Sequence, residues 1–234
     1  MNTYVVLLAG GRGTRMNAPV NKVLMPLYGK SVLRRSADAF LSVADEIVVV
    51  CREEEKSAVL REIPPDDFPF SVRFAQAGIT RQESVLNGLK AISPDPKDII
   101  LIHDAARCLV DSGLISRVIH SVMRHGTGIP AIQATSTFKV CDSHAIISRT
   151  VDRSSLYEAQ TPQGFTAEII IPFYRRAVED GFVCTDDASI PEHYGIPVRV
   201  VPGSAENIKL TESVDIARAK SILLKDTPLP RVGM

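Results

Sequence analysis

The 234-residue chain has no excess of either charge and no apolar run of membrane-spanning length. Lys and Arg together number 27, as do Asp and Glu, so no global field favours a nucleic acid or an anionic membrane as partner. No apolar run approaches the ~18 residues of a membrane span, and we expect no signal peptide at the N-terminus. Any anion site must therefore be a local cluster of charges.

The cysteines are few and far apart in the sequence. They are Cys51, Cys108, Cys141 and Cys184, and none forms a C-x-x-C pair. This spacing argues against a zinc ribbon or a redox motif and fits reduced thiols. The chain also has no Ser-His-Asp order and no paired catalytic carboxylate motif. We expect a cytoplasmic globular protein whose 45% apolar content is enough for a buried core.

Apolar runs typical of strands alternate with amphipathic helical segments. The expected strands are Tyr4–Ala9, Glu46–Cys51, Val72–Ala75, Ile99–His103, Ile129–Ala134 and Val198–Val201. Several are nearly continuous Val, Ile and Leu, as in strands covered on both faces. The expected helices are Ser31–Leu41, one opened by the capping box Thr80–Glu83, one capped by Asp111 or Ser112 and ended by Gly126, and Ser213–Leu224. The alternation predicts an α/β fold: a mostly parallel sheet with helices on both faces.

The pattern changes between Ser136 and Gly164, where short alternating segments surround polar turns. We expect a projecting β-arm at about residues 136–160, too short and polar to bury a core of its own. Such an arm is stable when it packs on a neighbour, which predicts a homodimer. A helical pattern resumes at Thr166, and Pro172 should kink that helix or delay its start. Residues 1–225 should form one domain and residues 226–234 a frayed tail.

The most informative segment is LAGGRGTRMNAPVNK, from Leu8 to Lys22. A glycine-rich turn follows an apolar strand directly, so backbone N–H groups can close around an anion. Arg15 and Lys22 add positive charge, which favours a triphosphate as the ligand. The loop is not a Walker A motif, because no Gly-Lys-Ser/Thr follows, and it lacks the third glycine of the dinucleotide fingerprint.

Two further segments follow expected strands at their carboxyl ends, where open α/β sheets bind ligands. Gly78–Ser84 begins a helix, so its backbone donors and the Ser84 hydroxyl could bind a flat base. Asp104 ends the fourth strand and is a candidate Mg²⁺ ligand near phosphates. The alternative for Asp104 is a helix or turn cap. For His103, a structural hydrogen-bonding role is favoured over catalysis.

Six ordered motifs carry a resemblance to a known family. LAGGRGTRM is similar to the opening of nucleotidyltransferases that transfer a nucleoside monophosphate to a phosphorylated sugar or polyol. HDAAR, TVDR, TPQGF, TDDAS and NIKLT follow, and the set resembles the 2-C-methyl-D-erythritol 4-phosphate cytidylyltransferases of the non-mevalonate isoprenoid route. The resemblance covers roughly Val5 to Leu224. It implies a Rossmann-like nucleotidyltransferase that uses CTP, Mg²⁺ and this polyol phosphate and releases pyrophosphate.

The same resemblance implies roles for individual residues. Arg15 and Lys22 match cations that stabilise the transition state, whereas Arg153 and Lys209 match residues that position the acceptor phosphate. Arg153 would act across the dimer interface. Positions that match the CTP site are Ala9, Gly10, Gly11, Gly78 and Ser84. Positions that match the metal or acceptor site are Asp104, Arg107, Thr137, Lys139, Thr161, Thr185 and Asp186.

Two departures and three alternatives accompany this interpretation. Asn21 and Cys108 stand where the family usually has proline, which makes the placement of Lys22 and Arg107 less constrained. A ribitol or ribulose 5-phosphate cytidylyltransferase would have similar loops, although VDRSSLYEAQTPQGF favours methylerythritol phosphate. A sugar-1-phosphate nucleotidyltransferase would need additional sugar-binding segments. A non-catalytic nucleotide-binding regulator would have no reason to keep the loop cations and Asp104.

Overall fold

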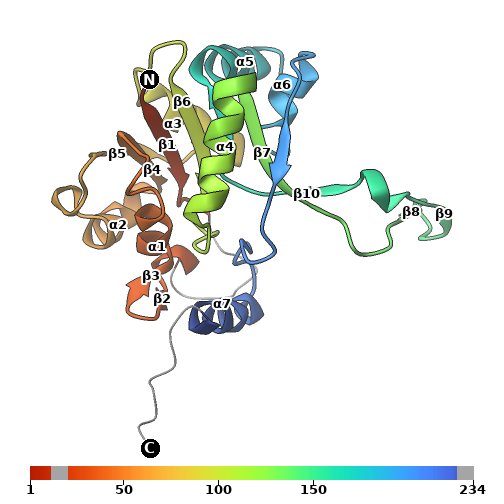
Figure 1. Cartoon of the computed structure of the whole chain (residues 1–234), viewed down its shortest axis with the longest axis horizontal. Helices are drawn as coiled ribbons and strands as arrows, with labels where there is room; N and C mark the ends of the chain where they lie inside the picture. The colour runs from red at the N-terminus through yellow and green to blue at the C-terminus, as the bar shows by residue number, and fades with distance from the viewer. Residues whose placement is uncertain (12–20, 226–234) are drawn as a thin grey trace, which may run out of the picture.

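The computed structural model describes residues 1–11 and 21–225, and its centre is an eight-stranded sheet (Figure 1). The strand order is β10-β7-β11-β6-β1-β4-β5, with β12 paired to β7. The strands are β1 (Thr3–Leu8), β4 (Glu46–Cys51), β5 (Ser71–Gln76), β6 (Ile99–Asp104), β7 (Thr127–Gln133), β10 (Tyr157–Ala159), β11 (Gln163–Thr166) and β12 (Val200–Pro202). Strand β1 is parallel to β4 and β6, β4 to β5, and β7 to β12. The predicted mostly parallel sheet is confirmed.

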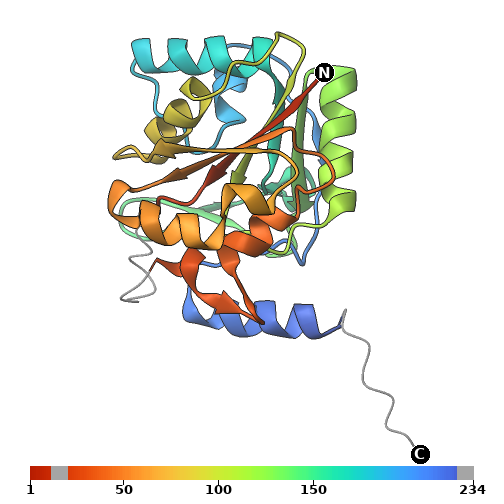
Figure 2. The ribbon, with the colours of Figure 1, turned by 90° about the vertical axis from the view of Figure 1, so that its left-hand side faces the viewer.

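Helices cover both faces of this sheet, as predicted. They are α1 (Val32–Asp38), α2 (Lys56–Glu62), α3 (Arg81–Lys90), α4 (Ser112–His125), α5 (Ala167–Glu179), α6 (Ser189–His193) and α7 (Ser213–Lys225). Successive β1 side chains point to opposite faces. Val5 and Leu7 join the apolar cluster under α1 and α4, whereas Val6 joins the cluster under α3 and α5. Figure 2 shows α3 and α5 on one side of the sheet and α4 on the other.

Local sequence signals set the limits of two helices. The Thr80 side chain accepts a hydrogen bond from the Glu83 backbone, and Glu83 returns one, so the predicted capping box begins α3. Asp111 caps α4 by accepting from Leu114 N at 2.8 Å. Gly126 ends α4 in the left-handed region at φ +77°, where a side chain is disfavoured. These predicted boundaries are confirmed.

Strand β11 was not expected from the sequence pattern. It is a four-residue strand that runs antiparallel between β6 and β7. Its residue Gly164 faces α4 so closely that an added Cβ would clash with Val118 and Val122. The strand therefore carries a glycine where a β-branched residue would have made it recognisable.

Helix α5 begins at Ala167 with Thr166 at its N-cap, so the helical pattern resumes where it was predicted. Of the two alternative effects expected of Pro172, a kink or a delayed start, the delayed start is wrong. The pairing of β11 with β6 fixes the start instead, because Ala167 N donates to Asp98 O at 2.9 Å directly after the strand. Pro172 lies within the helix. None of the described helices combines the length and apolar character needed to cross a bilayer.

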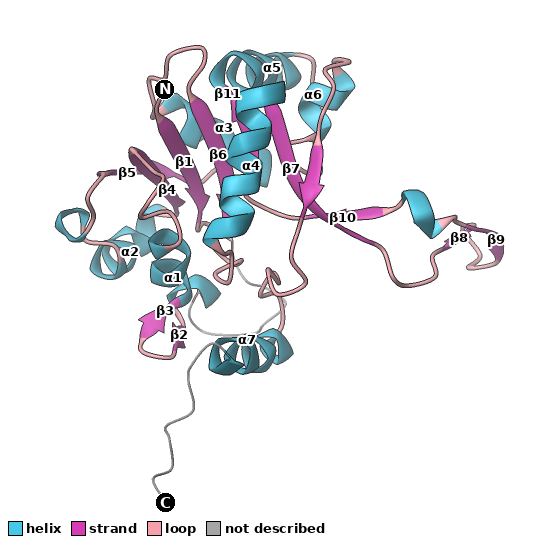
Figure 3. Ribbon diagram, viewed as in Figure 1, coloured by secondary structure: helices cyan, strands magenta, loops and turns pink. Residues whose placement is uncertain are grey.

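The predicted arm projects away from the sheet (Figure 3). Its tip is a hairpin of β8 (Lys139–Cys141) and β9 (Ile147–Thr150), and β10 returns the chain to the edge of β7. A second hairpin, β2 (Pro26–Leu27) and β3 (Lys30–Ser31), precedes α1. The arm exposes Ile146, Ile147 and Tyr157 at 64%, 57% and 54% of their surface.

Candidate active site

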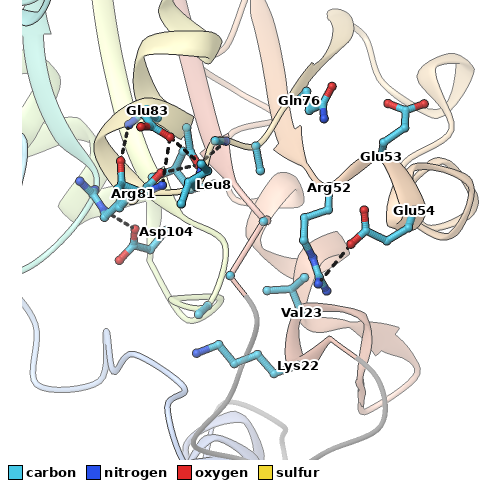
Figure 4. A pocket seen from close by; sticks show the side chains of 18 of the residues that line it. Leu8, Lys22, Val23, Arg52, Glu53, Glu54, Gln76, Arg81, Glu83 and Asp104 are labelled. Carbon is cyan, nitrogen blue, oxygen red and sulfur yellow. Dashed lines mark hydrogen bonds and ion pairs between the residues drawn. The ribbon is translucent and has the colours of Figure 1, made fainter. Parts of the chain in front are cut away.

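A cleft of about 890 Å³ lies at the carboxyl ends of β1, β4, β5 and β6 (Figure 4). This is the edge of the sheet where a ligand site was expected. The predicted residues that line it are Gly10, Gly11, Lys22, Gly78, Ser84, Asp104 and Lys209. Arg15 lies outside the described residues. Ala9 is fully buried directly behind the glycine loop.

Close backbone packing explains two of the cleft glycines. A Cβ on Gly10 would clash with Ala77, and a Cβ on Gly78 would clash with Glu83. Both glycines therefore allow the turns after β1 and β5 to approach their neighbours. Gly11 has open space on its Cβ side and faces the cleft. This leaves the backbone of the first loop accessible to an anion.

The turn before α3 is held together by the Ser84 side chain. Ser84 Oγ accepts from Gly78 N at 3.0 Å and donates to Thr80 O at 2.9 Å. The hydroxyl hydrogen that was expected to bind a base is thus used within the turn. The observed role of Ser84 is to shape the cleft wall, and its predicted contact with a base stays a prediction.

Asp104 lies between two cations at the end of β6. Lys209 Nζ is 2.6 Å from Asp104 Oδ2, and Arg81 Nε is 3.4 Å from Oδ1. Burial acts to raise the pKa of Asp104, but the charges of Arg81 and Lys209 outweigh it and hold that pKa below its ordinary value. Asp104 is therefore ionised at neutral pH and faces the cleft.

Arg81 is itself held in place by an ion pair with Asp187. Its two terminal nitrogens donate to the two Asp187 carboxylate oxygens at 2.9 and 2.7 Å, a bidentate pair. Asp187 is fully buried and also accepts from Tyr174 Oη at 3.0 Å. Burial and the Asp187 charge raise the pKa of Tyr174, so the phenol remains a neutral donor. This network fixes the guanidinium beside Asp104.

His103 has the structural role that was favoured. The Thr161 hydroxyl accepts from Asp104 N at 3.1 Å and lies 3.0 Å from His103 Nδ1, while His103 Nε2 lies 3.3 Å from Arg107 O. Burial lowers the pKa of His103 to about 3, so the ring is neutral at physiological pH. Through His103 on β6, these contacts join Thr161, which precedes β11, to the loop that follows β6.

Arg107 is buried and is not one of the described residues that line the cleft. Its guanidinium donates to Asn207 O at 2.7 Å and to Ala159 O at 3.4 Å, whereas its buried Nε has no partner within the described protein. Burial lowers the pKa of Arg107. Cys108, at the position of a departure, is buried, and its thiol pKa is raised to about 11. The Arg107 side chain is held by backbone carbonyls despite that departure.

The remaining predicted residues do not reach the cleft of their own chain. Thr137, Lys139 and Arg153 are exposed on the arm, where Arg153 Nη1 donates to Thr135 O at 2.7 Å. Thr185 is exposed. The next residue, Asp186, accepts hydrogen bonds within the protein, from Gln163 Nε2 at 2.8 Å and from Ser189 N at 3.1 Å. Their substrate contacts stay predictions.

Sequence reasoning missed two cations that line the cleft, Arg52 and Arg81. Arg52 follows β4 and pairs with Glu54 and Glu55. A signal for both existed, because each stands directly after a strand end or at a helix start of the kind that was singled out for other residues. Neither was recognised because an isolated arginine is usually a solvated surface group.

A mostly parallel sheet with a glycine loop, a lysine and an ionised aspartate at its carboxyl edge defines an α/β nucleotidyltransferase. The chain belongs to the 2-C-methyl-D-erythritol 4-phosphate cytidylyltransferase family, whose model matches residues 3–225. It is 38% identical over 223 residues to the enzyme of that name from Prochlorococcus marinus strain MIT 9313, covering 94% of this chain and 97% of the relative. It is 36% identical over 229 residues to that of Acidobacterium capsulatum, covering 94% and 96%.

Solved structures agree with this family membership. The 4-diphosphocytidyl-2C-methyl-D-erythritol synthase of Anaerococcus prevotii superposes with a TM-score of 0.83 at 27% identity, covering 95% of this chain and 96% of that one. The 2-C-methyl-D-erythritol 4-phosphate cytidylyltransferase of Thermus thermophilus superposes with a TM-score of 0.78 at 29% identity, covering 95% and 98%. The predicted fold and family are confirmed.

Proposed function

We propose that this chain transfers CMP from CTP to 2-C-methyl-D-erythritol 4-phosphate, giving 4-diphosphocytidyl-2-C-methyl-D-erythritol and pyrophosphate. The observation that carries the proposal is the cleft itself, which is lined by Gly10 and Gly11 of the glycine loop together with Lys22, Asp104 and Lys209. Relatives named for this cytidylyltransferase match the chain over nearly its whole length. A triphosphate needs such a loop, and a phosphorylated acceptor needs a second group of cations.

The chemistry requires positioning and charge rather than an activated side chain. The attacking group is a phosphate monoester with a second pKa near ~6, so it is largely a dianion at neutral pH and needs no general base. Its oxygen forms a bond to the α-phosphorus of CTP while the bond to pyrophosphate breaks. Lys22, together with Arg15, would stabilise the charge that develops there, and Lys209 would hold the acceptor phosphate.

Asp104 is the residue we propose for Mg²⁺. No group of three or more His, Cys, Asp or Glu side chains in the described parts of the chain could hold a metal without help. Mg²⁺ commonly binds through one or two carboxylates together with substrate phosphates. One ionised carboxylate beside a triphosphate loop fits that donor set. When bound, the ion would neutralise phosphate charge, and Asp104 would orient it.

We further propose that the arm completes the acceptor site of a second copy. Arg153 lies between β9 and β10 on the projecting arm and is not among the described residues that line the cleft, and Ile146, Ile147 and Tyr157 of the same arm are exposed. Arg153 of the partner subunit would then face the acceptor phosphate. We place the enzyme in the cytoplasm, which is supported by four cysteines that are all free.

Pyrophosphate release measured with each of the four NTPs, crossed with three polyol phosphates, tests the proposed function. We expect CTP with methylerythritol phosphate to give the highest kcat/KM. The exocyclic amine of cytosine can donate to a backbone carbonyl, whereas uracil presents an acceptor there, a difference of ~1–3 kcal/mol. Equal use of UTP, or faster turnover of ribitol 5-phosphate, would overturn the proposal.

A further inference from the structure

Asn21, the residue before Lys22, is buried and uses both ends of its side-chain amide. Its Nδ2 donates to Ala9 O at 2.9 Å and to Glu55 Oε2 at 3.0 Å, and its Oδ1 accepts from Val23 N at 3.3 Å. Only 7% of its surface is exposed. Both amide hydrogens and the amide oxygen are therefore engaged, and they join the end of β1 to the turn that carries Lys22.

The acceptor Glu55 is held in place from the other side by Arg52. Arg52 Nε donates to Glu55 Oε2 at 3.0 Å, and a second contact joins Arg52 Nη2 to Oε1. Arg52 follows β4 and lines the cleft (Figure 4). The carboxylate is therefore oriented before it meets Asn21. The result is a chain of hydrogen bonds from the cleft wall after β4, through Asn21, to the end of β1.

The backbone after Asn21 is anchored as well. Leu24 N donates to Asn21 O at 2.9 Å and Met25 N to Lys22 O at 3.2 Å, which makes residues Lys22–Leu24 a 3₁₀ turn. Val23 is buried in the core. Lys22 thus lies between two anchored neighbours, and Figure 4 shows its ammonium group directed into the cleft.

We propose that Asn21 is a positioning residue that acts through Lys22, by holding the backbone from which that lysine enters the cleft. The backbone of Asn21 has φ −56° and ψ 126°. Proline imposes a φ near −65° by ring closure. The Asn21 hydrogen bonds hold an open-chain residue in the same conformation. This inference rests on the proposed cytidylyl transfer, because Lys22 is read as the cation at the reacting phosphorus.

Two substitutions separate a positioning role from a structural one. Asn21→Ala removes the hydrogen bonds and frees φ, whereas Asn21→Pro removes the same bonds but keeps φ near its native value. We expect Asn21→Ala to lower kcat by about tenfold to a hundredfold, the range for a misplaced catalytic group, with the KM for CTP changed less than about twofold. Asn21→Pro should recover most of kcat, although both variants lose thermal stability.

Ser121→Ala is the matched control for burial. Ser121 is also 7% exposed, and its Oγ donates to Thr127 O at 2.7 Å, away from the cleft. Its loss should lower the melting temperature and leave kcat unchanged. If kcat fell in Asn21→Pro as far as in Asn21→Ala, or if Asn21→Ala kept the wild-type kcat, the proposal would be overturned.

A double variant tests the same proposal without relying on Asn21→Pro. Asn21→Ala added to Lys22→Ala should cause no further loss of kcat, because a residue that acts only through Lys22 has nothing left to position. Multiplied losses would overturn the proposal. An inactive wild-type chain would instead refute the cytidylyl transfer itself, so the two failures are distinguishable.

Discussion

The cleft and the arm both carry charged side chains, but they hold them differently. In the cleft, Asp104 contacts Lys209 and Arg81, and Arg81 is in turn bound by the fully buried Asp187. On the arm, Arg153 is exposed and donates to a carbonyl of its own segment. The first group is positioned by the core of this chain, whereas the second lies on a surface that the chain itself does not cover.

This difference indicates which part of the site exists before any ligand or partner arrives. Buried ion pairs keep their geometry at a cost in desolvation, and that cost is repaid only if each charge keeps its partner. Exposed pairs contribute little to stability and can exchange partners freely. The cleft is thus preorganised, whereas the exposed contacts of the arm add little to its stability.

The largest expected effect follows from breaking the buried pair. Asp187→Ala leaves the Arg81 guanidinium without its bidentate partner, which should lower the free energy of unfolding by about 3–5 kcal/mol. Urea denaturation measures it. Ser148→Ala on the arm, which removes the bond from Ser148 Oγ to Val140 O, should change stability by less than ~0.5 kcal/mol. Equal effects at the two positions would contradict the contrast.

The next effect concerns catalysis in the cleft. Lys22→Ala should lower kcat by a factor equivalent to ~2.7–4 kcal/mol while changing the KM for CTP little, because the charge acts mainly on the transition state. Steady-state pyrophosphate release measures both constants. Lys30→Ala is the control, because Lys30 forms an ion pair with Asp38 and neither residue is among the described residues that line the cleft. A near-normal kcat in Lys22→Ala would show that its catalytic assignment is wrong.

The sequence was sufficient wherever the determining contacts are local. Glu46–Cys51 was predicted with the limits that β4 has, because a continuous apolar run between polar residues is itself the signal. The capping box at Thr80 and the terminal Gly126 were equally readable, since each depends on residues within four positions. The order of motifs along the chain was enough to indicate the family.

The parts that were missed depend on contacts between distant residues. Arg81 and Asp187 are 106 positions apart, and only the fold shows that one binds the other. Asn21 was expected to leave Lys22 less constrained, but its partners Ala9 and Glu55 come from other elements and anchor it. Strand β11 carries Gly164 where it packs against α4, so its sequence lacks the β-branched or alternating apolar pattern that predicts a strand.

A third effect comes from the buried histidine behind the cleft. The pKa of His103 is lowered to about 3 in the fold, against about 6.5 in an unfolded chain. Between these values the unfolded state binds more protons, so the free energy of unfolding should fall as the pH decreases from about 7 to 5, by ~2 kcal/mol from this group. Urea denaturation at the two pH values measures it.

The control for this pH dependence is a comparison of two histidines. His103→Gln should lose the ~2 kcal/mol component, whatever its absolute stability, because no titrating group remains at that position. His120→Gln should keep it, since His120 is exposed on α4. A wild-type pH dependence in His103→Gln would show that another group is responsible.

The smallest effect, a factor of two, decides whether the arm acts on its own cleft or on that of a second copy. If Arg153 acts in trans, a heterodimer of Arg153→Ala and Lys22→Ala chains has one site damaged twice and one site intact. Each heterodimer should then recover about half of the wild-type activity, although both parent proteins are nearly inactive. Differently tagged chains allow the heterodimer to be isolated before the assay. If a confirmed heterodimer stays inactive, Arg153 acts in cis, and the arm has to reach the cleft of its own chain.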